Sequence, residues 1–225
     1  MMYLLGQFTQ RASIIKFSKT NVAVDWKLEI VSSESSENLA SPPLSEMNEI
    51  YSYVQPENSN SIYACGYKWD KTTDEEYSLA SAMKVDERGK VSFLYVWNQR
   101  LPGATFTQMD MCKQVSYDSY RKELVFLLEV TSSSLRPSYS AYSAASAANK
   151  DILIVTMKES GQFMKGININ MDTSSVSMIL GSNSLFVRDG NYIFGGFSYG
   201  YSTKFHNVTY DLVTPTYDSF VFKYD

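Results

Sequence analysis

The sequence predicts an all-β fold in which about 14 short strands form an array of four-stranded sheets that is incomplete at both ends. Three observations lead to this prediction. Short apolar segments alternate with polar residues at a period of two, which is the signal of a strand. Aromatic residues are frequent, with 17 Tyr and 12 Phe, and they pack well on pleated surfaces. Finally, two strand motifs each occur four times.

The first motif is a strand that ends at Gly in three of its four copies, and the second is a strand with Lys near its end. The copies of the first are Met2–Gly6, Ile62–Gly66, Leu124–Leu128 and Tyr192–Gly196. Those of the second are Ser13–Lys19, Leu79–Asp86, Asp151–Gln162 and Ser219–Asp225. The Gly positions are 60, 62 and 68 residues apart, and the Lys positions (16, 84, 158 and 223) are 68, 74 and 65 apart. This spacing indicates radially repeated sheets that bury their faces only against neighbouring copies.

The strands of the first two units follow from alternation and from the turn residues between them. Residues 32–45 are rich in Ser and contain Pro42-Pro43, so they are expected to form a loop. Turns are expected at Pro56–Ser61 and at Asp86–Gly89, where glycine supplies a positive φ. The strands are predicted at Tyr3–Phe8, Ser13–Phe17, Val24–Ile30, Glu49–Val54, Ile62–Gly66, Leu79–Val85 and Val91–Trp97.

The second half of the chain continues the pattern with one long interruption. Residues 131–150 (TSSSLRPSYSAYSAASAANK) show no strand alternation and are predicted to be a loop, while residues 199–215 are predicted to form a long arm. Turns are expected at Ser119–Lys122, Ser160-Gly161 and Asp189–Asn191. The strands are predicted at Cys112–Tyr117, Leu124–Val130, Asp151–Met157, Met164–Ile169, Val176–Leu180, Ser184–Val187, Tyr192–Phe197 and Phe220–Tyr224.

Four segments carry a family resemblance. Gly190–Gly196 (GNYIFGG) and Asp218–Asp225 (DSFVFKYD) are the closest, followed by Asp151–Ser160 and, more loosely, Ser78–Asp86. With them the chain resembles the β-propeller repeat of bacterial secreted and surface proteins. In that repeat a blade has an inner strand, a G-N-x-Y-x-x-G strand, a D-x-F-x-x-K-x-D strand and an outer strand. The first copy departs from the pattern at Ala12-Ser13, where Asp is usual, and the third lacks the Gly.

The resemblance implies a β-propeller-type array with a partial blade at 1–48, complete blades at 49–110 and 111–183, and a partial blade at 184–225. The first blade would lack its inner strand and the last its outer strand. We therefore expect the missing strands to come from a neighbouring subunit or from further chain, and the open blade edges to act as templates for strand addition. The alternative is a small open sheet assembly with frayed ends.

Composition narrows the possible partners. The net charge is −4 and the 20 Lys and Arg residues are scattered, so nucleic acid is not expected as a partner. No apolar run reaches the roughly 18 residues of a transmembrane helix. The opening MMYLLGQFTQR continues into a strand pattern, and we interpret it as structure and not as a signal peptide. A chain that begins and ends within a repeat is also expected to be part of something longer.

No catalytic, cofactor or metal site is predicted. His206 is the sole histidine and falls in the predicted arm, so a surface position is favoured over a catalytic triad. One His and two separated Cys cannot make a tetrahedral metal site. Cys65 and Cys112 lie on neighbouring predicted strands, which leaves a disulfide or two buried free thiols, the latter favoured. The acidic run around residues 70–76 lacks the ligand spacing of a calcium loop, so a solvated loop is favoured.

The sequence therefore predicts a non-enzymatic scaffold that binds a protein partner or further copies of itself. Exposed tyrosines would supply contact area at low entropic cost, and the candidates are Tyr139, Tyr142, Tyr199 and Tyr201. Asn207 begins an Asn-Val-Thr acceptor for N-glycosylation, consistent with an extracellular or cell-surface location. The alternatives are a carbohydrate-binding or carbohydrate-active propeller, with acids converging on a pocket, and an intracellular subunit of a large assembly.

Overall fold

The computed structural model describes residues 2–8, 11–17, 24–29, 47, 49–70, 77–96, 110–130, 151–169, 177–205 and 208–224. Within these ranges the chain contains 14 strands and no helix, which confirms the predicted all-β class. This part of the chain accordingly holds no apolar helix of membrane-spanning length.

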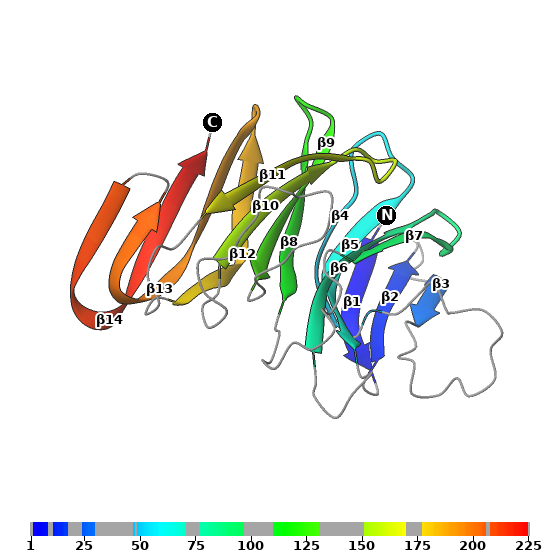
Figure 1. The fold of residues 1–225 in the computed structure, drawn as a ribbon. Coiled ribbons are helices and arrows are strands. Elements are labelled where there is room, and N and C mark those ends of the chain that lie inside the picture. Colours follow the sequence, from blue (N-terminus) through cyan, green and yellow to red (C-terminus); the bar gives the residue numbers. More distant parts are fainter. Residues whose placement is uncertain are drawn as a thin grey trace.

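The strands form four antiparallel sheets, each built from consecutive strands (Figure 1). The first sheet contains β1 (Met2–Phe8), β2 (Arg11–Phe17) and β3 (Val24–Glu29). The second contains β4 (Glu49–Val54), β5 (Ile62–Asp70), β6 (Tyr77–Val85) and β7 (Val91–Val96). The third contains β8 (Met111–Asp118), β9 (Glu123–Val130), β10 (Asp151–Met157) and β11 (Phe163–Ile169). The fourth contains β12 (Ser177–Arg188), β13 (Asn191–Phe205) and β14 (Val208–Tyr224).

The core lies between the sheets, with one apolar cluster at each junction of neighbours. Strand β9 lies between two such clusters, and every residue from Leu124 to Val130 is buried. Phe126 points toward the second sheet, whereas Leu127 points toward the fourth. A strand that is covered on both faces needs apolar residues at successive positions, which explains the unbroken run LVFLL.

The four sheets follow one another in a row in chain order, and the first and fourth sheets lie at its opposite ends (Figure 1). Contacts between sheets are concentrated on the leading strands β4, β8 and β12 and on their immediate neighbours, while β7 and β11 contact chiefly their own sheets. Ser52 of β4, for example, accepts a hydrogen bond from the Val115 N–H of β8 at 3.3 Å. The row is open, and its sheets approach one another most closely along their leading strands.

Tight turns lie at the same end of the strands in the second and third sheets. Ile62 pairs with Val85, so the turns that precede β5 and follow β6 lie at the same end of the second sheet. Turns Asp86–Lys90 and Lys158–Gln162 have the same hydrogen bonds, from the first residue's N–H to the last residue's carbonyl. Each contains a glycine with positive φ, namely Gly89 at 82°, as predicted, and Gly161 at 89°.

Equivalent positions in the four sheets are fixed by the strand register. The motif positions Gly6, Gly66, Leu128 and Gly196 each lie four residues after the first paired residue of their strand. Lys16, Lys84 and Lys223 are likewise equivalent, each pairing with the second residue of the preceding strand's ladder.

The predicted alignment of Lys158 with these lysines is wrong. The equivalent residue of the third sheet is Thr156, which pairs with Val125, while Lys158 corresponds to Asp86 at the start of the turn. Thr156 is buried, whereas the Lys158 side chain is partly exposed at the turn. The spacing of lysines along the sequence therefore does not fix the register.

Two further predictions for the fourth sheet are wrong. Its leading strand is one continuous strand, β12, with an irregularity between Leu180 and Leu185, and not two short strands. The predicted arm at residues 199–215 is a paired extension of β13 and β14, which ends where Phe205 pairs with Val208. Polar residues in both segments interrupt the apolar alternation, although backbone pairing resumes beyond each irregularity.

Gly66 is required by a close backbone approach. Strand β4 is irregular between Ile50 and Ser52, and a Cβ on Gly66 would collide with the Glu49 carbonyl. We expect Gly66→Ala to destabilise the protein by about 1–3 kcal/mol, because the neighbouring backbone must shift. Urea denaturation measures the change, and Gly166→Ala on the exposed edge strand β11 is the control. Equal stability of both variants would contradict this close approach.

Candidate interaction surface

The outer face of the fourth sheet exposes apolar side chains that the sheet does not bury. Residues Tyr192 and Phe194 of β13, with Phe222 of β14, pack toward the third sheet. The alternate residues therefore lie on the opposite side, which we call the open face; it is formed by Phe186, Ile193, Gly195, Phe197, Ser219, Val221 and Lys223. Val221 is 78% exposed, Phe186 56% and Phe197 48%.

The register makes these residues neighbours. Phe186 pairs with Ile193, which in turn pairs with Lys223, so the three form one row across the sheet. Gly195 pairs with Val221, whose Cγ2 would lie 3.6 Å from a Cβ built on the glycine. The apolar side chains are thus contiguous across three strands and bordered by polar residues, an arrangement that marks interaction sites in soluble proteins.

Aromatic pairs stiffen the sheet beneath this face. Tyr192 stacks on Tyr224 with ring centroids 6.3 Å apart, and Phe194 stacks on Phe222 at 5.5 Å. Each pair joins neighbouring strands on the side that packs against the third sheet. Because cross-strand aromatic pairs stabilise the ladder, the open face is carried on an ordered support.

Two buried polar side chains of the third sheet hold β12 at its irregularity. The Gln114 amide accepts a hydrogen bond from Leu185 N–H at 2.7 Å and donates one to Leu185 O at 3.0 Å. The Glu129 carboxylate accepts a hydrogen bond from Leu180 N–H at 2.7 Å and lies 3.9 Å from Lys113 Nζ. These side chains pair backbone groups near the irregularity, so they position the strand that carries Phe186.

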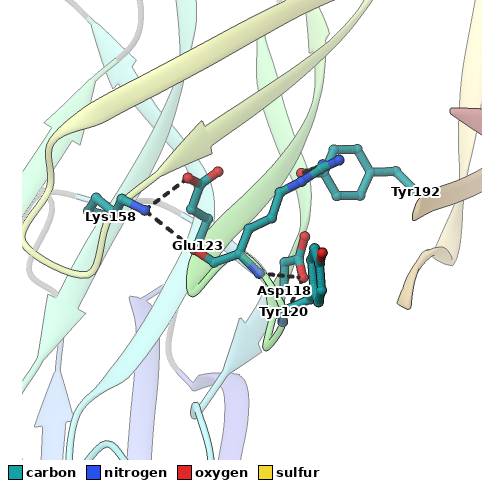
Figure 2. A network of polar contacts seen from close by, with 6 residues as sticks. Asp118, Tyr120, Glu123, Lys158 and Tyr192 are labelled. Atoms are coloured by element: carbon teal, nitrogen blue, oxygen red, sulfur yellow. Dashed lines mark hydrogen bonds and ion pairs between the residues drawn. The ribbon is translucent and has the colours of Figure 1, made fainter. Parts of the chain in front are cut away.

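A polar network joins a turn of the third sheet to Tyr192 on strand β13 of the fourth sheet (Figure 2). Asp118 accepts hydrogen bonds from Tyr120 N–H at 3.0 Å and Arg121 N–H at 3.1 Å, which orders the turn. Arg121 Nη1 donates to Tyr192 Oη at 2.8 Å, and its guanidinium lies 5.4 Å from the ring centroid. Lys158 Nζ donates to Glu123 Oε1 at 3.0 Å. We interpret this network as structural, since it links neighbouring sheets.

Lysines make a related contact at the two earlier junctions. Lys16 Nζ of the first sheet donates to Glu87 O in a turn of the second, at 3.2 Å. Lys84 Nζ of the second sheet donates to Glu159 O in the equivalent turn of the third, at 3.3 Å. Tyr63 Oη donates to the same carbonyl at 3.2 Å, and its burial, followed by the Glu159 charge, raises the pKa of the Tyr63 phenol.

The two cysteines are buried free thiols, in agreement with the favoured prediction. Cys65 Sγ donates to Cys112 O at 3.3 Å across the junction of the second and third sheets. Burial, followed by the adjacent Cys65, raises the pKa of the Cys112 thiol well above its usual value. The thiolate form that reacts or binds metals is therefore disfavoured at Cys112.

Most of the residues singled out from the sequence lie outside the described ranges: Tyr139, Tyr142, His206 and Asn207. Tyr199 and Tyr201 lie in the part of β13 whose backbone alone is described. The predicted contact surface of these residues therefore stays a prediction. Among the described residues, no three His, Cys, Asp or Glu side chains form a group that could hold a metal ion.

The open face was missed at the sequence level, although a signal for it exists. In Ser219–Asp225 (SFVFKYD), Phe220 and Phe222 supply one face of the strand while Val221 adds an apolar residue to the other. Apolar residues on both faces indicate a strand that is covered on both sides. Sequence alone does not reveal that this second side is exposed.

Comparison with known proteins leaves the family open. No protein-family model and no curated protein matches the chain. Among solved structures, a mutant of the Synechocystis apocarotenoid oxygenase matches with a TM-score of 0.38 and 12% sequence identity. The match covers 97% of this chain and 46% of that one, so the chain spans about half the length of that structure. Similarity at this level assigns neither a fold family nor a function.

Proposed function

We propose that the protein is a non-enzymatic scaffold of β-propeller type, which binds a protein partner or further copies of itself. The exposure of Val221, Phe186 and Phe197 on one sheet face is the observation that carries the proposal. Strands β9 and β10 of the third sheet are covered on both faces by the neighbouring sheets, whereas the open face of the fourth sheet exposes apolar side chains to solvent. Covering that face with a partner would remove apolar surface from water.

Two features support the propeller arrangement within this proposal. The sheets approach one another mainly along their leading strands, as blades do around a common axis. Each leading strand also becomes irregular just after the residue that pairs with the Gly-motif position, namely after Ile50, Cys112 and Leu180. Repeated blades would have this shared strand order and these irregularities that begin at equivalent positions.

The location proposed for the scaffold is extracellular or at the cell surface, with Asn207 as a glycan site. This part of the proposal is supported by the sequence motif and by the resemblance of the strand motifs to secreted repeats. The intact mass of the protein from its native source shows whether Asn207 carries a glycan. An unmodified mass would remove Asn207 from the proposal.

Hydroxyl-radical footprinting tests whether the open face is covered in use. We expect Phe186 and Phe197 to react less, by at least threefold, in a concentrated lysate of the source cells than in dilute purified protein. Tyr120, which is 75% exposed on a turn of the third sheet, is the internal reference for radical dose. Unchanged reactivity of both phenylalanines relative to Tyr120 would overturn the proposal.

An enzymatic or carbohydrate-binding role is the competing outcome. Val221→Lys places a charge in the middle of the open face at a site that tolerates it, because the side chain is exposed. If the protein hydrolyses or binds glycans and this variant retains the activity in full, the scaffold role of the open face is wrong.

A further inference from the structure

We infer that the occupant of the open face is a second copy of this chain, docked head to tail through its first sheet. The inference rests on the proposed scaffold function and names its partner. It follows from the way in which consecutive sheets of the chain already contact each other. Each of the first three sheets presents the same face to the sheet that follows it, and the open face is the corresponding face of the fourth.

The donor of the existing junctions recurs on the open face. Lys16 lies on β2 and Lys84 on β6, the strands that carry the Lys motif. Each donates a hydrogen bond to a turn carbonyl of the following sheet. Lys223 occupies the equivalent register position on β14, is exposed and lies on the open face. It therefore stands where the existing junctions place a donor to the next sheet's turn.

The apolar residue beside that donor follows the same pattern. Two residues before the equivalent positions Lys16, Lys84, Thr156 and Lys223 stand Ile14, Ala82, Ile154 and Val221. The first three are 0%, 1% and 0% exposed, because the following sheet covers them. Val221 is 78% exposed. The fourth sheet thus carries the residue types of a junction without a described sheet against it.

The first sheet of another copy is the element that fits this junction. The second, third and fourth sheets each have a sheet before them in the row, whereas the first sheet is preceded by none among the described residues. A contact between the fourth sheet of one copy and the first sheet of the next is heterologous. Such contacts give a closed ring when the rotation between copies closes, and a filament when it does not.

Photo-cross-linking determines the orientation of the contact. Val221 is replaced by benzoylphenylalanine in the full chain, and isotopically light and heavy copies are mixed so that links between copies are identified by mass. We expect links to peptides within residues 2–29 of another copy. Links to residues 208–224 of another copy indicate a face-to-face contact and would overturn the inference, as would the absence of links between copies.

Sedimentation velocity of the purified chain measures the association itself. We expect Val221→Lys to weaken association at least a hundredfold and Lys223→Met about tenfold, because the latter loses one charged hydrogen bond. Met164→Lys, an exposed apolar site on the third sheet, is the matched control and is expected to associate like the unaltered chain. Circular dichroism confirms that each variant is folded.

A chain that remains monomeric at every concentration refutes self-docking. The footprinting result then separates the two proposals, because protection of Phe186 and Phe197 in the lysate alone keeps the scaffold function with a different partner. Loss of both protection and self-association overturns the scaffold function together with the inference.

Discussion

Phe126→Ala is expected to destabilise the protein by about 3–5 kcal/mol, the usual cost of removing a buried aromatic side chain. Phe126 is 0% exposed and packs in the cluster between the second and third sheets. The truncation leaves a cavity that neighbouring strands, held by their ladders, cannot fill completely. Urea denaturation followed by circular dichroism measures the loss.

Tyr120→Ala provides the comparison for Phe126, because this ring is exposed on the turn between β8 and β9. Its truncation is expected to change stability by no more than about 0.5 kcal/mol. A loss below about 1 kcal/mol for Phe126→Ala would mean that the junction between the sheets collapses around the missing ring or is not formed.

Glu129→Leu is expected to cost about 2–4 kcal/mol and to loosen β12 in particular. The substitution leaves the Leu180 N–H without its carboxylate acceptor and removes the charge beside Lys113. Hydrogen exchange resolved by peptide is the measurement. We expect β12 to exchange faster while β5 and β6 are unaffected.

Glu129→Gln separates the hydrogen bond from the charge in this comparison. Its amide oxygen can still accept from Leu180 N–H, so we expect it to retain most of the protection of β12. If Glu129→Leu left exchange in β12 unchanged, Glu129 would not be holding this strand. Faster hydrogen exchange at Phe186 in the leucine variant would also connect the Glu129 contact to the open face.

Most of the strands are predictable from sequence because of how the sheets are covered. Strand β9 is apolar at successive positions, and two of the hairpin turns carry glycine where φ is positive, at Gly89 and Gly161. Both signals are local. They come from side chains and dihedral angles that act within one strand or one turn.

The errors concern features that are set by contacts beyond a single strand. The irregularity in β12 depends on Gln114 and Glu129, which come from another sheet and lie far away in sequence. The true equivalent of Lys84 is Thr156, and only the ladder register reveals it. The open face could not be predicted for the same reason. The sequence shows that Val221 is apolar and which face of the strand it occupies, but not whether another sheet covers that face.

The two ends of the strands differ in how well they would accept inserted residues. The turns Asp86–Lys90 and Lys158–Gln162 contain carbonyls that accept hydrogen bonds from lysines of the preceding sheet. Residues added in these turns would break those hydrogen bonds and weaken the contact between neighbouring sheets. The pair Val130–Asp151 lies at the other end of the third sheet, because the same ladder ends at Leu124–Met157 next to the turn Lys158–Gln162. A reporter domain, an epitope or a new recognition loop inserted between Val130 and Asp151 would therefore leave the lysine contacts between the sheets in place.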